Sequence, residues 1–137
     1  MRWFARPGRR ASATSTPHRT TASGLSERRL GESLRSYPRD ELVVSTKVGR
    51  LLEPRDTSDA QDPEGFVVPA THRRVWDFSR DGVLRSIEAS LGRLALDRID
   101  LVLIHDPDDH AREALEAAAP TLSQLRSKGS SADTAWA

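Results

Sequence analysis

The chain has 137 residues, of which 30% are charged and 36% are hydrophobic, so it can form one domain around one core. It is too short for a complete (β/α)8 barrel, which needs roughly 200–250 residues or more. The sequence contains no cysteine, which excludes disulfides and thiolate metal sites. No apolar run approaches the roughly 20 residues that a membrane span requires.

The formal net charge of +1 conceals an uneven distribution of charge. Residues 1–24 contain five of the 21 basic residues and no acidic residue, which leaves 16 basic against 20 acidic residues and a net charge of −4 for the rest. This distribution gives no basis for a nucleic-acid-binding surface on the folded part. We expect residues 1–23 to be a disordered basic leader. A transit-type targeting segment is the alternative, with an organellar location in place of a cytoplasmic one.

Regular structure is expected to begin near Leu25. Ser26 can cap a helix that runs from Glu27 to about Ser36, and Pro38 ends it. The β-branched, apolar stretch 41–48 predicts a strand with Lys47 at its C-terminal end. Residues 51–77 contain three prolines and many charges, which predicts a long loop anchored by Trp76 and Phe78.

The second half of the chain has clearer periodicity. Ser79 or Asp81 caps a helix whose apolar residues follow the 3.6-residue period to Leu96. The nearly unbroken apolar run 99–104 predicts a strand covered on both faces, and it ends abruptly at His105.

A third helix is predicted from His110 to about Lys128. Pro120 should kink or divide this helix, and Gly129 should end it. Residues 130–137 are small, polar and unpatterned, which predicts a disordered tail. The order of elements alternates between helix and strand, so the fold class is α/β, with parallel strands joined by helical crossovers. Two strands make a poor sheet, so residues 24–129 look like part of a larger α/β domain.

Lys47 and His105 are the candidate functional residues, because each marks the polar C-terminal end of a buried-type strand. Such strand ends carry the chemistry in α/β folds. A neighbouring lysine favours a neutral imidazole near pH 7, which can donate a hydrogen bond to a carbonyl oxygen. The alternative is that Lys47 is a solvated strand terminus and that His105 is a hydrogen-bonded loop residue.

The polar residues that follow His105 allow two interpretations. Asp106, Asp108, Asp109 and His110 could be mistaken for a metal site, but no further ligand follows at a defined spacing. Adjacent acids after a strand more often cap the next helix. His72 and the two arginines after it are expected to be solvated.

Four segments, taken together and in order, resemble the aldo/keto reductase family, and most closely its aldose, fucose, galactose and pyridoxal dehydrogenases. These segments are Gly-Leu-Ser-Glu-Arg-Arg-Leu-Gly-Glu-Ser-Leu at 24–34, Leu-Val-Val-Ser-Thr-Lys-Val-Gly-Arg at 42–50, Asp-Gly-Val-Leu-Arg-Ser-Ile-Glu-Ala-Ser-Leu-Gly-Arg-Leu at 81–94 and Asp-Arg-Ile-Asp-Leu-Val-Leu-Ile-His-Asp-Pro-Asp at 97–108.

The resemblance implies a partial (β/α)8 TIM barrel, about a third to a half of the complete one. The family moves a hydride between NADP or NAD and a small carbonyl or sugar substrate, with a catalytic tetrad of Asp, Tyr, Lys and His. Lys47 matches the lysine, which tunes the tyrosine, and His105 matches the histidine, which orients the substrate oxygen. The strands that bind the cofactor come later in the family, so binding by this chain is doubtful.

The family's aspartate and tyrosine, in an Asp-x-Ala-x-x-Tyr motif, should lie just before Gly24 and are absent. We hypothesise that residues 1–23 are read out of frame, because one set of codons for Ser15–Ser23 encodes Asp-Thr-Ala-Pro-His-Tyr-Gly-Leu two bases later. The tail allows a similar shift to Val-Gly-Met. Resequencing the encoding DNA tests this hypothesis.

Two functions are therefore expected as alternatives. The first is a reductase fragment that is inactive as this chain. The second is a non-catalytic remnant or interaction module that self-associates through unpaired strand edges.

Overall fold

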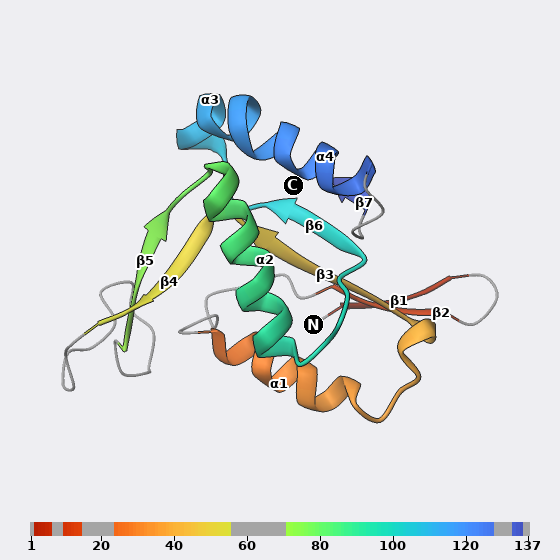
Figure 1. Cartoon of the computed structure of the whole chain (residues 1–137). Helices are drawn as coiled ribbons and strands as arrows, with labels where there is room; N and C mark the ends of the chain where they lie inside the picture. The colour runs from red at the N-terminus through yellow and green to blue at the C-terminus, as the bar shows by residue number, and fades with distance from the viewer. Residues whose placement is uncertain (1, 7–9, 15–23, 56–70, 128–132, 136–137) are drawn as a thin grey trace.

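The computed structural model describes residues 2–6, 10–14, 24–55, 71–127 and 133–135. Its centre is a five-stranded sheet in the order β1-β2-β3-β6-β7, and a second sheet pairs β4 with β5 (Figure 1). The strands are β1 Arg2–Arg6, β2 Arg10–Thr14, β3 Leu42–Val48, β4 Arg50–Pro54, β5 His72–Trp76, β6 Leu101–Ile104 and β7 Asp133–Ala135. Strands β2, β3, β6 and β7 are parallel, which confirms the predicted α/β class with a parallel sheet.

Strands β3 and β6 are the two strands that the sequence predicts, and they are neighbours in the sheet. Their register pairs Lys47 with Leu103, and Val48 with Ile104. The His105 N–H then donates to the Val48 carbonyl at 2.9 Å, which continues the pairing by one step. The C-terminal ends of both strands therefore meet at the same edge of the sheet.

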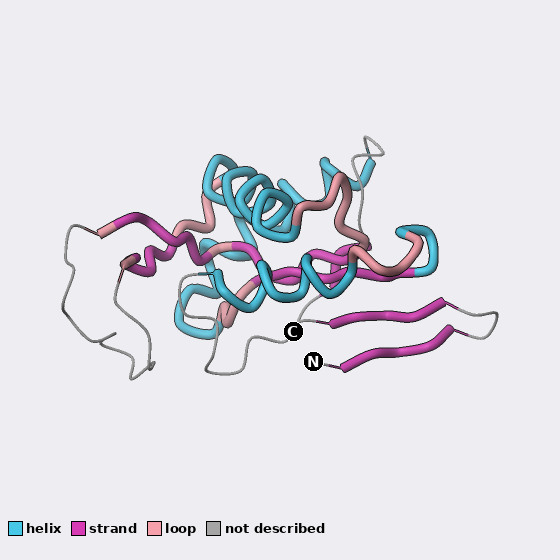
Figure 2. The backbone as a smooth tube through the Cα atoms, turned by 90° about the horizontal axis from the view of Figure 1, so that it is seen from below, coloured by secondary structure: helices cyan, strands magenta, loops and turns pink. Residues whose placement is uncertain are grey.

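Helix α1 (Leu25–Leu34) packs against α2 (Arg80–Leu94), and α2 packs against β3. In Figure 2 the helices gather over the part of the sheet away from the β1–β2 pair. The hydroxyl of Ser79 accepts a hydrogen bond from the Gly82 N–H and caps α2, as predicted. The predicted cap at Ser26 is wrong, because α1 begins after Gly24. Gly24 has a φ of 74° and supplies no side-chain hydrogen bond.

The predicted third helix is divided, as expected from Pro120. It consists of α3 (Ala111–Glu113), a π-helical turn at Ala114–Ala118 and α4 (Ala119–Ser127). Proline has no N–H to donate, and its ring crowds the carbonyl four residues earlier. The wider π turn just before Pro120 accommodates both effects. Gly129 lies outside the described residues.

The prediction of a continuous loop over residues 51–77 is wrong at both ends. Strands β4 and β5 form an antiparallel pair in which Arg50 lies opposite Trp76, and Pro54 lies opposite His72. The prolines misled the prediction, because a proline is tolerated at the end of an edge strand. Residues 56–70, which include two of the three prolines, lie outside the described part of the chain.

Residues 2–6, 10–14 and 133–135 form strands toward the two edges of the five-stranded sheet. They contribute β1 and β2 at one edge of the sheet and β7 at the other. Their backbones pair with β3 and β6, whose N–H and C=O groups would otherwise be unpaired. Backbone pairing of this kind depends little on side-chain pattern, which is why periodicity did not indicate it.

The hydrophobic core lies between the sheet and the helices. In β3 all residues are buried except Val43 and Lys47, which are half-buried, and in β6 half-buried and buried residues alternate. No helix in the described ranges is long and apolar enough to cross a membrane. The core residues are Leu30, Leu34, Leu42, Val44, Val48, Phe78, Val83, Leu94, Ile99, Val102, Ile104, Ala114, Ala118 and Leu122.

Candidate active site

Lys47 and His105 both contact the carboxylate of Asp106. The Lys47 ammonium donates a hydrogen bond to one Asp106 oxygen at 3.2 Å. Nε2 of His105 lies 3.5 Å from the other oxygen. The side chains of Lys47 and His105 are 15% and 16% exposed, whereas that of Asp106 is 63% exposed. The two residues predicted from the sequence therefore lie together at the C-terminal ends of β3 and β6.

Asp106 carries the charge that sequence reasoning missed. Partial burial acts to raise the pKa of this carboxyl group, but the hydrogen bond from Lys47 and the charges of His105, Lys47 and Arg50 outweigh it. The pKa of Asp106 is consequently below its ordinary value. The expectation from the sequence considered only the repulsion between the charges of Lys47 and His105 and left this carboxylate out. In the sequence, the position of Asp106 directly between His105 and Pro107 was the only sign of this role.

Asp106 departs from the capping role predicted for the acidic residues that follow His105. It does not cap the next helix, because neither α3 nor the short 3₁₀ helix Asp108–His110 has a side-chain cap. Within the described ranges, no group of three His, Cys, Asp or Glu side chains could hold a metal ion. Asp106 faces the strand ends instead, with a φ of 35°.

An aromatic cluster borders the site on the side of β5. The ring of Trp76 meets His105 edge-on at 5.7 Å and stacks on Phe78 at 5.7 Å. Trp76 also lies 5.2 Å from the ring of His110, and the Arg50 guanidinium lies 5.0 Å from the Trp76 ring. Sequence reasoning expected Trp76 and Phe78 only to anchor a loop. In the structure Trp76 joins the β4–β5 pair to His105, and Phe78 lies 5.3 Å from the ring of His110.

A buried polar cluster fixes β3 next to Lys47. The Thr46 hydroxyl donates to Glu27 at 2.7 Å and lies 3.1 Å from the Ser90 hydroxyl. The other Glu27 oxygen accepts a hydrogen bond from Arg93 at 2.5 Å. These contacts tie β3 to both α1 and α2, so the strand that carries Lys47 is held from two sides.

A pocket of about 150 Å³ lies between α2 and β4, and Lys47, Arg50, Glu53 and Arg85 are among the residues that line it. Pockets that enclose drug-sized ligands measure about 300–1,000 Å³. This pocket is therefore too small for a dinucleotide.

A family model for the aldo/keto reductase family matches residues 22–133, which is most of the chain. The chain belongs to the aldo/keto reductase family. The partial (β/α)8 barrel expected from the resemblance is thereby confirmed, at about a third of the complete barrel.

Three curated relatives are dehydrogenases. D-threo-aldose 1-dehydrogenase from Pseudomonas sp is 50% identical over 110 residues, which cover 77% of this chain and 33% of the relative. Pyridoxal 4-dehydrogenase from Microbacterium luteolum is 37% identical over 61% of this chain and 26% of its own. L-galactose dehydrogenase from Arabidopsis thaliana is 32% identical over 77% of this chain and 27% of its own. The chain spans a third or less of these relatives.

Solved structures agree with this assignment. An aldo-keto reductase from Pseudomonas aeruginosa superposes with a TM-score of 0.59 at 32% identity, over 86% of this chain and 40% of the other. Glycerol dehydrogenase from Gluconobacter oxydans gives a TM-score of 0.58 at 25% identity, over 81% and 29%. Both similarities cover most of this chain and less than half of the larger protein.

Proposed function

We propose that this chain is a fragment of an NAD(P)-dependent aldo/keto reductase that moves a hydride between the nicotinamide and a sugar or aldehyde. The observation that carries the proposal is the meeting of Lys47 and His105 on one carboxylate at the C-terminal edge of a parallel sheet. The family uses NAD(P)H, and the curated relatives are named for aldose, pyridoxal and galactose. Within this proposal, Lys47 and His105 are the catalytic residues.

The proposed division of labour follows from the side chains. The bound nicotinamide supplies or accepts the hydride. His105 is suited to donate a hydrogen bond to the substrate oxygen, and the Lys47 ammonium stabilises negative charge beside it. The catalytic tyrosine and aspartate of the family have no counterpart at their expected positions, and the pocket beside Lys47 does not enclose a dinucleotide. We therefore propose that this chain alone is inactive.

A chimera tests the catalytic assignment. Residues 24–127 replace the matching segment of the Pseudomonas D-threo-aldose 1-dehydrogenase, which then supplies the rest of the barrel. We expect sugar oxidation in the parent chimera, and a kcat at least about 100-fold lower after Lys47→Met or His105→Gln. Arg112→Gln, on α3, is the matched control and should retain full activity. Folded variants with the kcat of the parent would refute the roles of Lys47 and His105.

A second candidate function rests on the sheet edges. Strands β1 and β7 are the outer strands of the five-stranded sheet, and outer strands invite pairing with another chain. In this alternative the chain is a non-catalytic module that self-associates. An NADPH titration of the chain, followed by fluorescence, is paired with size-exclusion chromatography. Cofactor binding by a monomer favours the reductase, whereas soluble oligomers without NADPH binding favour the interaction module.

A further inference from the structure

The loop after β6 places a carboxylate between the two proposed catalytic side chains. We infer that Asp106 is a positioning residue, whose carboxylate holds the Lys47 ammonium and the His105 imidazole in a fixed relation at the site. The inference rests on the proposed function for its catalytic meaning, but the contacts themselves belong to this chain. One oxygen of Asp106 serves each partner, at 3.2 Å from Lys47 and 3.5 Å from His105.

The backbone at Asp106 supports this role. Its φ of 35° lies in the left-handed region, which residues other than glycine, asparagine and aspartate rarely adopt. Asp106 also precedes Pro107, and a following proline restricts the backbone further. This conformation directs the carboxylate back toward the strand ends. Unusual backbone geometry of this kind is concentrated at functional sites.

The partners of Asp106 come from separate parts of the fold. Lys47 lies on β3, 59 residues away in the sequence, and His105 is held to β3 through its N–H on the Val48 carbonyl. Arg50 on β4 adds a further positive charge that acts on Asp106. The Lys47 ammonium, the His105 ring and the Arg50 guanidinium therefore act on this carboxylate from three directions, and together they lower its pKa.

Because an ammonium group that loses its carboxylate partner gains rotational freedom, ordering of Lys47 is the direct measure of this role. The experiment uses the full chain and measures 13C relaxation at Lys47 Cε at pH 6. We expect an ordered Lys47 in the parent and a loss of most of that order in Asp106→Asn. Asp106→Glu keeps the charge and should restore part of the order. Asp108→Asn, two residues further along the chain, is the matched control and should match the parent.

A titration of the parent chain keeps the inference testable if Asp106→Asn does not fold. Because the pKa of Asp106 is lowered, the order at Lys47 should persist through pH 5 and decline only below the ordinary aspartate range near about 4. Order at Lys47 that is unchanged in folded Asp106→Asn would overturn the inference. So would order in the parent that persists after the Asp106 carboxyl, followed by its own 13C signal, has been protonated. Neither result depends on catalysis, so neither bears on the chimera test of Lys47 and His105.

Discussion

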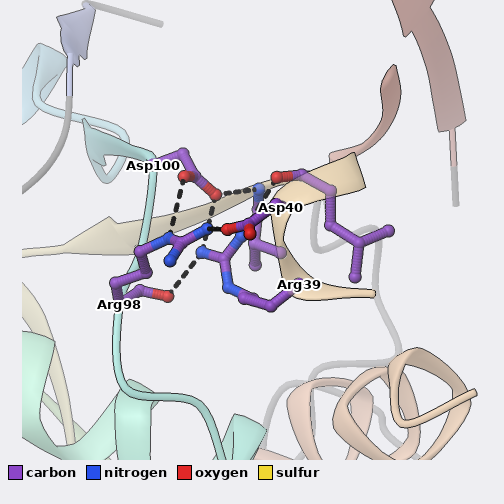
Figure 3. A network of polar contacts seen from close by, with 6 residues as sticks. Arg39, Asp40, Arg98 and Asp100 are labelled. Carbon is purple, nitrogen blue, oxygen red and sulfur yellow. Dashed lines mark hydrogen bonds and ion pairs between the residues drawn. The ribbon is translucent and has the colours of Figure 1, made fainter. Parts of the chain in front are cut away.

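Arg39, three residues before β3, forms an ion pair of 2.7 Å with Asp100 at the entry of β6 (Figure 3). The same Asp100 oxygen accepts the Val44 N–H at 2.8 Å, and the Asp100 N–H returns a bond of 2.9 Å to the Val44 carbonyl. Arg39 also donates to the carbonyl of Arg98 at 2.7 Å. This network sets the register of the two strands at the end opposite to Lys47 and His105.

Replacement of Asp100 by asparagine should destabilise the chain by about 2 kcal/mol, because Arg39 would lose its charged partner in a site that is largely shielded from water. The free energy of unfolding is measured by urea denaturation. The matched control is Asp40→Asn, since Asp40 pairs with Arg98 at an 88% exposed position and should change stability much less. Equal effects of the two variants would show that the Arg39–Asp100 pair stabilises the chain no more than the exposed pair does.

The buried pair of Glu27 and Arg93 predicts a second difference in stability. Arg93→Met leaves the Glu27 carboxylate, which is only 12% exposed, without its cation and should cost about 3 kcal/mol. Arg85→Met breaks the more exposed pair with Asp77 and should cost less than about 1 kcal/mol. Thermal unfolding of both variants under the same conditions makes the comparison. A cost for Arg93→Met no larger than that for Arg85→Met would contradict this account.

Two glycines in the helices should respond oppositely to alanine. At Gly31 a Cβ would lie 2.2 Å from the Leu94 carbonyl oxygen, so Gly31→Ala must push α1 away from α2 and should cost about 1–3 kcal/mol. At Gly92 a Cβ would meet nothing within 4 Å. Gly92→Ala should therefore stabilise α2 by about 0.5–1 kcal/mol. Urea denaturation distinguishes the signs, and a destabilising Gly92→Ala would be the contrary result.

The Asp77 carboxyl group, just before α2, should make the stability of the chain depend on pH. Partial burial acts to raise the pKa of Asp77, but hydrogen bonds from the Ser79 hydroxyl and N–H, together with Arg85, lower it below the ordinary value. A lowered pKa in the folded state adds stability above the unfolded pKa of about 4, and this stability is lost as the pH falls through the folded value.

In Asp77→Asn, the decrease in stability between about pH 5 and pH 2 should be smaller than in the parent. The free energy of unfolding is measured by denaturant titration at several pH values. Asp81→Asn, an exposed change in the first turn of α2, is the control and should retain the slope of the parent. A slope unaltered by Asp77→Asn would show that this carboxyl group does not couple to folding.

The sequence by itself determined β3, β6, α2 and the places of Lys47 and His105. An apolar run that ends at a polar residue indicates a buried strand directly, and the 3.6-residue period of α2 indicates which face of the helix is buried. These signals are local, since each depends on neighbouring residues along the chain. The family resemblance added the barrel and the roles proposed for the two side chains.

Only the tertiary structure decided which partners meet. Asp106 and Lys47 are 59 residues apart, as Arg39 and Asp100 are 61 apart, and such contacts depend on the register of β3 against β6. The pairing of β4 with β5 and the contact of Trp76 with His105 are long-range in the same sense. Hydrophobic periodicity reports whether a residue is buried and does not report what lies beside it, so the carboxylate at the centre of the site emerged only from the fold.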